Sequence, residues 1–350
     1  MTSASCTQRT CSPVGRALRE RVLILVVFIA GIAASLAASA VLVTRLERLG
    51  ERLGAPEAML GLITALAADS PEISAAVAAL ARGQRDVGVG VVLGSNVFNL
   101  AALLGLSALI SGRIVLHRRV VILEGVVALW VAAASIATIA RIVTPAQGLG
   151  LTLAAFIPYV VVSALPPAER HRFPIPRPWR AWLASAVNDE ELELLAAIHP
   201  RKGSWPDVAA ALVALTVVVV ASTAMEWSAS VLGVRYGVSS IVVGGLILAA
   251  VTSLPNAVAA IYLASRGRAS ATLSEAFNSN ALNTIIGLMI PAVVLGMGRP
   301  PEGGVVTAGW YAGLTAITVS VAYAGRGVSR RAGILIIAVY LIFAVVLSVT

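Results

Sequence analysis

Ten long apolar segments dominate this chain of 350 residues and limit the folds that it can adopt. Each is about 20 residues or longer, enough for a helix rising about 1.5 Å per residue to cross a hydrocarbon core of about 30 Å. Strands of an outer-membrane barrel are about half as long and alternate polar with apolar residues, so the spans are predicted to be helices. We place them near residues 22–44, 57–80, 88–111, 120–140, 146–165, 208–234, 239–264, 271–297, 304–324 and 332–349.

The composition agrees with a multi-pass protein whose solvent is the lipid bilayer. Hydrophobic residues make up 58% of the chain and charged residues only 12%, about half the charged fraction of an ordinary soluble domain. The net charge of +9 would suggest nucleic acid as a partner of a soluble protein, but here the arginines lie in the connections between spans. We expect an all-α integral membrane protein that binds no nucleic acid, and no sequence motif indicates an enzyme.

The longest hydrophilic stretch, residues 166–207, divides the spans five and five. Because five is odd, the second half must enter the membrane from the opposite side, which is the inverted-repeat plan that secondary transporters commonly use. We therefore predict ten transmembrane helices as two inverted five-helix repeats, residues 1–165 and 208–350, joined by a central cytoplasmic loop.

A matched motif supports a true repeat. The segment PEISAAVAALARGQRDVGVGVVLGSNVFN runs from Pro71 to Asn99, and PNAVAAIYLASRGRASATLSEAFNSNALN runs from Pro255 to Asn283. In both segments 24 residues separate the opening proline from the serine of the closing Ser-Asn pair, and a glycine follows an arginine at the same offset. Several landmarks matched without a gap indicate two copies of one unit.

Basic residues give an orientation. With the amino terminus outside, the cytoplasmic connections hold 17 of the 26 Lys and Arg residues, and the opposite assignment leaves nine there. Cytoplasmic loops carry the excess of basic residues in membrane proteins. We expect the amino terminus outside and, because alanine and arginine are abundant and Lys202 is the single lysine, the inner membrane of a bacterium. The oligomeric state is left open.

Prolines interrupt one span in each half. Proline has no N–H to donate and clashes with the carbonyl four residues earlier, so Pro71 should free the carbonyl of Ala67, and Pro255 that of Val251. A bound cation or water can satisfy a freed carbonyl inside a membrane. Many transporters use broken helices to expose carbonyls for this purpose. The alternative is a plain kink satisfied by a neighbouring Ser or Thr, and the prolines alone favour neither.

Oxygen-bearing side chains surround both prolines and favour a cation site. A charge at the centre of a bilayer costs about 2.5–3.5 kcal/mol on insertion scales, so two carboxylates within four residues need a function, and hard cations prefer oxygen ligands. We expect Glu72 and Asp69 to be the metal-binding carboxylates of a site that uses small inorganic cations (Ca2+, Na+ or H+) and no cofactor. The predicted cation-binding residues are Asp69, Ser70, Glu72, Ser95, Asn99, Thr252, Ser253, Asn256, Ser279 and Asn283.

These motifs resemble the two alpha repeats of the cation/calcium exchanger superfamily, which includes sodium/calcium and calcium/proton exchangers. The resemblance joins GLITALAADSPE and GSNVFN, near residues 57–111, to GGLILAAVTSLPN and NSNALN, near residues 239–297. It implies an antiporter that works by alternating access around a mid-membrane cation site. It also implies that Glu72 is the ion-binding glutamate of the first repeat, with Ser95 and Asn99 as polar ligands on the next helix.

The second repeat departs from the family pattern. The glutamate expected after the second proline is Asn256, and Asn283 stands where many sodium/calcium exchangers have an acidic residue. Where a Gly-Asn pair is usual, this chain has Ser274 and Glu275. An amide keeps an oxygen ligand but removes a negative charge, which weakens binding of a dication relative to a monocation or a proton.

The first repeat departs at Asp69. Ten residues separate Gly61 from Pro71, whereas eleven separate Gly244 from Pro255, so Asp69 stands in for either the usual Thr or the usual Ser. Asp69 could restore the missing charge. Two nearby carboxylates also repel each other and can share a proton, which suits cation/proton exchange.

Two other functions compete with the antiporter. A relative that has lost exchange and acts as a cation-sensing or structural membrane protein would explain the two amides, Asn256 and Asn283. A transporter of organic solutes has little support, since no arginine or aromatic cluster lies at the inferred site. Glu226 and Glu275, inside other spans, either line an access path or reach an interface.

Overall fold

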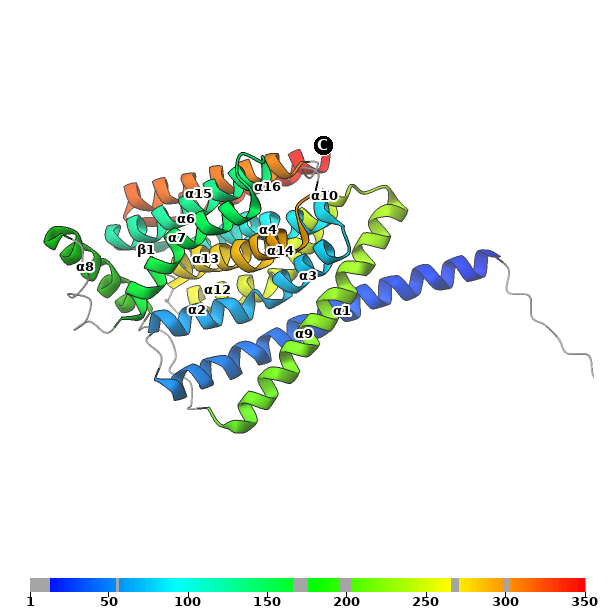
Figure 1. The fold of residues 1–350 in the computed structure, drawn as a ribbon, viewed down its shortest axis with the longest axis horizontal. Helices are drawn as coiled ribbons and strands as arrows, with labels where there is room; N and C mark the ends of the chain where they lie inside the picture. The colour runs from blue at the N-terminus through cyan, green and yellow to red at the C-terminus, as the bar shows by residue number, and fades with distance from the viewer. Residues whose placement is uncertain are drawn as a thin grey trace, which may run out of the picture.

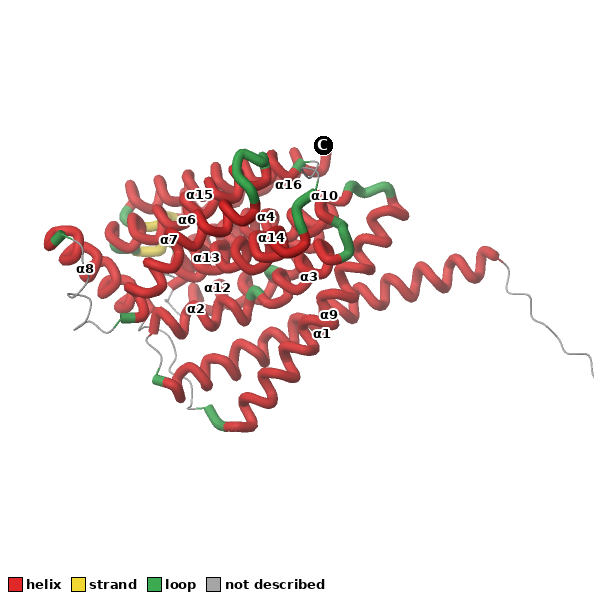
Figure 2. Tube along the Cα trace, in the orientation of Figure 1, coloured by secondary structure: helices red, strands yellow, loops and turns green. Residues whose placement is uncertain are grey.

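The computed structural model describes residues 13–54, 57–165, 176–194, 203–265, 271–298 and 303–349, and nearly all of them are helical (Figures 1 and 2). The first half contains α1 (Pro13–Leu53), α2 (Glu57–Ala68), α3 (Ser70–Ala81), α4 (Arg85–Asn99), the π-helical segment η1 (Leu100–Leu106), α5 (Ser107–Ser111), β1 (Arg113–Val115), α6 (Arg118–Ile139) and α7 (Pro145–Ala164).

The second half repeats this order after a connecting helix, α8 (Arg177–Leu194). It contains α9 (Trp205–Tyr236), α10 (Ser240–Val242), the π-helical segment η3 (Val243–Leu248), α11 (Ala249–Thr252), α12 (Leu254–Ser265), α13 (Ala271–Leu282), the π-helical segment η4 (Asn283–Met289), α14 (Ile290–Leu295), α15 (Gly304–Gly325), β2 (Gly327–Ser329) and α16 (Arg330–Val349).

The helices confirm the predicted spans. Among the described residues, eight helices are long and apolar enough to cross a membrane, and two further helix pairs pass the same test with a bend at a short break, so that there are ten spans when each pair is counted as one. The bent spans join α2 to α3 at 55° and α10–α11 to α12 at 43°. The protein is therefore an all-α membrane protein with five spans in each half.

The spans lie side by side, except for α1 and α9, which pack against each other and cross one side of the bundle obliquely (Figure 1). The two short strands pair antiparallel, with Arg113 opposite Ser329, and form a ribbon at one end of the bundle (yellow in Figure 2). Helix α8 lies at this end, against α2, α6 and α13. We call it the ribbon end; the turn between α6 and α7 lies at the opposite end.

Glycines bring the two halves into backbone contact at the centre. Helix α4 packs against η3, and a Cβ on Gly90 would lie 2.9 Å from the backbone nitrogen of Gly245. A Cβ on Gly94 would overlap the backbone of Gly245 as well. Residues without a side chain are therefore required where α4 crosses η3.

Each proline lies in the first turn of a new helix, after a break of one residue. Pro71 is the second residue of α3 and Pro255 the second of α12, a position where the missing N–H costs nothing. The breaks fall at Asp69 and Ser253. The broken spans predicted from the prolines are thus present, and Asp69 and Ser253 occupy equivalent positions.

The one-residue difference between the repeats is taken up by η3. A π-helical turn holds one more residue than an α-helical turn, and such turns are frequent at functional sites. The corresponding part of the first half, within α2, is an ordinary α-helix, whereas residues Val243–Leu248 form the π-helical turn. Since the extra residue lies upstream of the break, Asp69 corresponds to Ser253 and not to Thr252.

Candidate cation site

The ten predicted side chains are all buried in the middle of the bundle. Their positions follow from the two broken spans and from the two helices that cross at the centre, α4 and α13, which contact each other. Asp69, Glu72 and Asn256 are each fully inaccessible to solvent. The structure therefore brings oxygen-bearing groups from both halves together, away from lipid and bulk water.

Asp69 is held by the second half of the chain. Its Oδ1 accepts hydrogen bonds from Asn256 Nδ2 at 2.7 Å and from Ser279 Oγ at 2.6 Å. Asn256 Nδ2 also lies 3.4 Å from Ser279 Oγ. A carboxylate can only accept, and hydrogen bonds to a charged acceptor are the strong ones. The helix break at Asp69 in the first half is thus joined by hydrogen bonds to α12, just after the break in the second half, and to α13.

Glu72 is held in the same manner one turn further along α3. Its Oε2 accepts a hydrogen bond from Asn283 Nδ2, and Ser253 lies beside the carboxylate. Asp69 lies close enough for its charge to act on Glu72. Asn99 completes the contacts by donating from Nδ2 to Ser279 Oγ at 3.1 Å. Both carboxylates of the first half are therefore oriented by amides and hydroxyls of the second.

The remaining oxygens of these groups have no hydrogen-bond partner among the described residues. A buried oxygen left without a partner costs about 1–3 kcal/mol, and native structures contain few of them. Carboxylate and amide oxygens are the ligands that hard cations take. The unpartnered atoms are Asp69 Oδ2, Glu72 Oε1, Ser95 Oγ, Asn99 Oδ1, Ser253 Oγ, Asn256 Oδ1 and Asn283 Oδ1.

Two predicted ligands donate hydrogen bonds to backbone carbonyls. Ser70 Oγ donates to the carbonyl of Ala67 at 2.7 Å, and Ser39 Oγ reaches the same carbonyl at 3.3 Å. Thr252 Oγ1 donates to the carbonyl of Leu248 at 2.8 Å. Of the two alternatives for the Ala67 carbonyl, the structure shows the second, because neighbouring serine hydroxyls donate to it.

Two asparagines that the sequence reasoning did not select join the halves directly. Asn96 Nδ2 donates to the backbone carbonyl of Asn280 at 3.2 Å, and Asn280 Nδ2 donates to that of Asn96 at 3.0 Å. These residues are the asparagines of the two closing Ser-Asn pairs, separated by the same 184 positions as the two prolines. That shared offset was the signal that could have identified them.

Glu226 and Glu275 differ in their surroundings. Glu226 is fully buried, forms an ion pair with Arg82 and accepts a hydrogen bond from Ser230 Oγ at 2.9 Å. Glu226 therefore links α9 to the residue that follows α3, and both alternatives for it stay predictions. Glu275 is half-buried, and its Oε2 has no hydrogen-bond partner within the described part of the chain.

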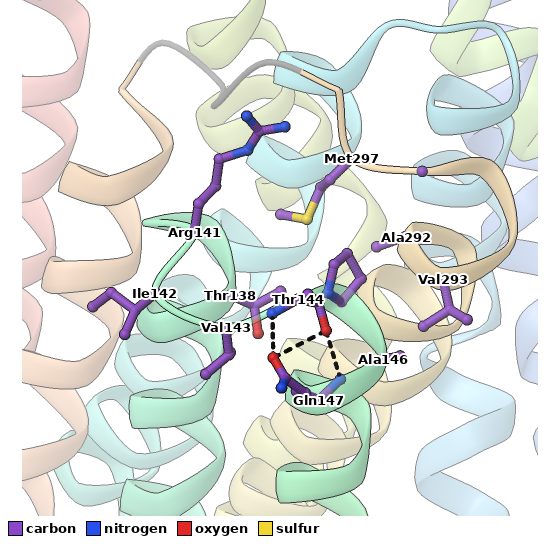
Figure 3. Close-up of a pocket in the computed structure, with 12 residues that line it drawn as sticks. Thr138, Arg141, Ile142, Val143, Thr144, Ala146, Gln147, Ala292, Val293 and Met297 are labelled. Carbon is purple, nitrogen blue, oxygen red and sulfur yellow. Dashed lines mark hydrogen bonds between the residues drawn. The ribbon is translucent and has the colours of Figure 1, made fainter.

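An open pocket of about 570 Å3 lies at the end opposite the ribbon, between the α6–α7 turn and α14 (Figure 3). Arg141 and Met297 line it, beside the hydrogen-bonded pair Thr144 and Gln147. No carboxylate is among its twelve lining residues.

No group of three His, Cys, Asp or Glu side chains close enough to hold a metal ion occurs in the described residues. The buried oxygens of the central site instead combine two carboxylates with amides and hydroxyls.

Known proteins share both the sequence pattern and the fold. The inner membrane protein YrbG of Escherichia coli is 28% identical over 245 residues, which cover 69% of this chain and 70% of YrbG. The structure of native YfkE superposes with a TM-score of 0.61 at 15% identity and covers 97% of both chains. A structure of the sodium-calcium exchanger NCX_Mj gives a TM-score of 0.58 at 20% identity, covering 92% of this chain and 98% of that chain.

The sequence profile of the family described as sodium/calcium exchanger protein matches two stretches, residues 23–165 and 207–349. Together they include nearly all of the predicted spans and both proline-containing motifs. The chain therefore belongs to the sodium/calcium exchanger protein family.

Proposed function

We propose that the protein is a secondary active antiporter that exchanges small inorganic cations across a bacterial inner membrane by alternating access. One observation carries this proposal: one oxygen of each of two buried carboxylates, and several amide oxygens, contributed by both halves, have no hydrogen-bond partner among the described residues. Membership of an exchanger family and the fold shared with the sodium-calcium exchanger NCX_Mj support it. The function is transport, and we assign the protein neither an enzymatic activity nor a cofactor.

The proposed substrate is Ca2+ or Na+, moved against H+ or Na+. Asp69 and Glu72 would bind it together with the oxygens of Asn99, Asn256 and Asn283. Two ionised carboxylates balance the charge of one dication. They also balance two monocations, or one monocation and a proton. The site therefore has the charge that either exchange reaction requires.

The amide nitrogens would keep the carboxylates in place while the cation leaves. Each carboxylate of the first half accepts from an amide of the second, Asp69 from Asn256 and Glu72 from Asn283. Without a cation these donors stabilise the negative charge, so that the site stays assembled between binding events. The amide oxygens then bind the cation without breaking the same hydrogen bonds.

The organisation of the chain follows from the same plan. We propose that residues 1–165 and 208–350 form the two exchanger repeats and that residues 166–207 connect them on the cytoplasmic side. The amino terminus is then outside, in agreement with the distribution of basic residues. This orientation puts the ribbon end, with α8, in the cytoplasm.

Flux measurements on purified protein in liposomes test the proposal. We expect uptake of 45Ca2+ or 22Na+ that depends on an opposing proton or sodium gradient. Glu72→Gln removes a charge from the buried site and should abolish uptake, whereas Glu51→Gln, at the end of α1, should leave it unchanged. Absence of exchange for every pair of ions, or full activity of Glu72→Gln, would contradict the proposal.

A second candidate is a cation-sensing or structural relative without transport activity. It is favoured by Asn256 and Asn283, which replace acidic residues that the family resemblance leads one to expect. Calorimetry distinguishes the two functions, because cation binding without flux under any gradient supports the sensor. Binding together with gradient-dependent flux excludes it.

A further inference from the structure

The two halves differ in what lies between the cation site and each end of the bundle. On the side away from the ribbon, Gly90 and Gly94 of α4 pack directly on the backbone of Gly245. The residues 184 positions later are Ser274 and Asn278 of α13. Close backbone packing in one half is therefore replaced by polar side chains in the other.

These polar side chains have partners in α6 and α7. Ser274 Oγ donates to Glu124, which is 2% exposed, and Asn278 Nδ2 donates to Tyr159 Oη at 3.3 Å. All four groups lie on the ribbon side of the site, because α13 begins at that end and reaches the site only at Ser279. Polar groups therefore continue from the site toward one end of the bundle.

Glu275 follows Ser274 on α13 and lies near Asp69. It precedes Ser279 by four residues, a spacing that places two side chains on the same face of a helix, and Ser279 Oγ is hydrogen-bonded to Asp69. The charge of Asp69 acts on Glu275. Among the described residues, no Lys or Arg forms an ion pair with Glu275, and its Oε2 is buried without a hydrogen-bond partner. A carboxylate oxygen that is buried without a hydrogen bond costs free energy, and a bound cation would offset this cost.

The carboxylates succeed one another along the bundle axis. Glu275 lies one turn before Ser279 on α13, Asp69 lies at the break, and Glu72 lies one turn further along α3. The pocket at the opposite end is lined by Arg141 and by no carboxylate. Toward the opposite end, the buried carboxylate Glu226 is neutralised by its ion pair with Arg82. Glu275, on the ribbon side, has a buried oxygen without a hydrogen-bond partner among the described residues, and its charge attracts cations.

We propose that Glu275 is a second cation-binding position, which receives the cation at the ribbon end and transfers it to Asp69 and Glu72. This inference rests on the proposed transport function and adds a residue that acts on one face of the membrane only. The ligand class is a small inorganic cation, bound by one carboxylate before it reaches the two-carboxylate site. Loss of this charge lowers the local cation concentration on that face.

The test compares the two faces of the membrane. Right-side-out and inverted vesicles from cells expressing the protein expose opposite faces to labelled Ca2+ or Na+. Glu275→Gln should raise the half-saturating cation concentration by about tenfold on the ribbon face and leave it unchanged on the other. Glu275→Asp keeps the charge and should restore the wild-type value within about twofold. Glu51→Gln serves as the control for loss of a carboxylate elsewhere.

Three outcomes decide the matter. A one-sided increase supports the proposal. An equal increase on both faces assigns Glu275 to the central site or to folding and overturns it, and so does an unchanged value on both faces. A second substitution, Glu275→Ser, repeats the test with a smaller side chain if glutamine impairs assembly. Absence of flux in the wild type would instead refute the proposed function, so the two failures are distinguishable.

Discussion

Asn256→Glu places a second carboxylate beside Asp69, whose Oδ1 accepts a hydrogen bond from Asn256 Nδ2 at 2.7 Å. Two unit charges 4 Å apart repel by about 4 kcal/mol at an effective dielectric constant of about 20. A lost hydrogen bond to a charged acceptor adds about 1.5–3 kcal/mol. We therefore expect the empty site to be destabilised by several kcal/mol, which appears as a lower unfolding temperature in the absence of cations.

Asp69→Ser in the same chain should relieve this repulsion. The double variant has a serine at both helix breaks, because residue 69 corresponds to Ser253, and it keeps two carboxylates: Glu72 and the introduced glutamate. We expect Asp69→Ser alone to weaken Ca2+ binding strongly, and the double variant to recover most of it. A coupling energy of at least about 2 kcal/mol is expected from the double-mutant cycle, since the two positions are in direct contact.

Isothermal calorimetry of the detergent-solubilised protein with Ca2+ and Na+ provides the four affinities of the cycle. A difference of about 1.4 kcal/mol is a tenfold change in the dissociation constant, so the expected coupling is readily measured. The effect of Asn256→Glu on Ca2+ affinity is compared in two backgrounds, the wild type and Asp69→Ser. If the affinity changes by the same factor in both, the two positions are independent. That result would refute the idea that Asp69 supplies the charge missing at Asn256.

Two further predictions concern the packing around the site. Gly94→Ala should destabilise the protein by about 1–3 kcal/mol, since the new Cβ meets the Gly245 backbone. Gly150→Ala should not destabilise it, because no atom lies within 4 Å of the new Cβ. Thermal unfolding in detergent compares the two variants, and equal melting temperatures would contradict the packing argument. Arg82→Ala leaves Glu226 buried and unpaired and should cost about 3–5 kcal/mol, most of which Glu226→Gln in the same chain should recover. A melting temperature that stays low in that double variant would show that the ion pair is not the cause.

Much of the fold was accessible from the sequence. Lengths of apolar runs determine spans, and prolines act locally, so the ten spans and the breaks before Pro71 and Pro255 could be predicted. All ten candidate side chains, selected by their positions around the two prolines and on the following helices, are buried. Local rules of chain geometry account for these successes.

The partners of individual side chains could not be predicted. The hydroxyl of Ser70 has two acceptable acceptors, the Ala67 carbonyl and a cation, and only the local helix geometry decides between them. Two of these contacts join residues more than 140 positions apart in the sequence: the ion pair of Arg82 with Glu226 and the reciprocal hydrogen bonds of Asn96 and Asn280. Such contacts depend on how the two halves dock, and no local pattern encodes that.

The π-helical turn η3 has a consequence for the resting state of the protein. Two identical inverted repeats would make the conformations open to either face equal in energy, and each would be half populated. The extra residue in η3 adds to the other differences between the repeats that remove this degeneracy, because the two conformations no longer exchange equivalent contacts. A difference of 1.4 kcal/mol already gives a tenfold preference between two states. An inserted residue at this position can thus contribute to the preference of the empty protein for one face of the membrane.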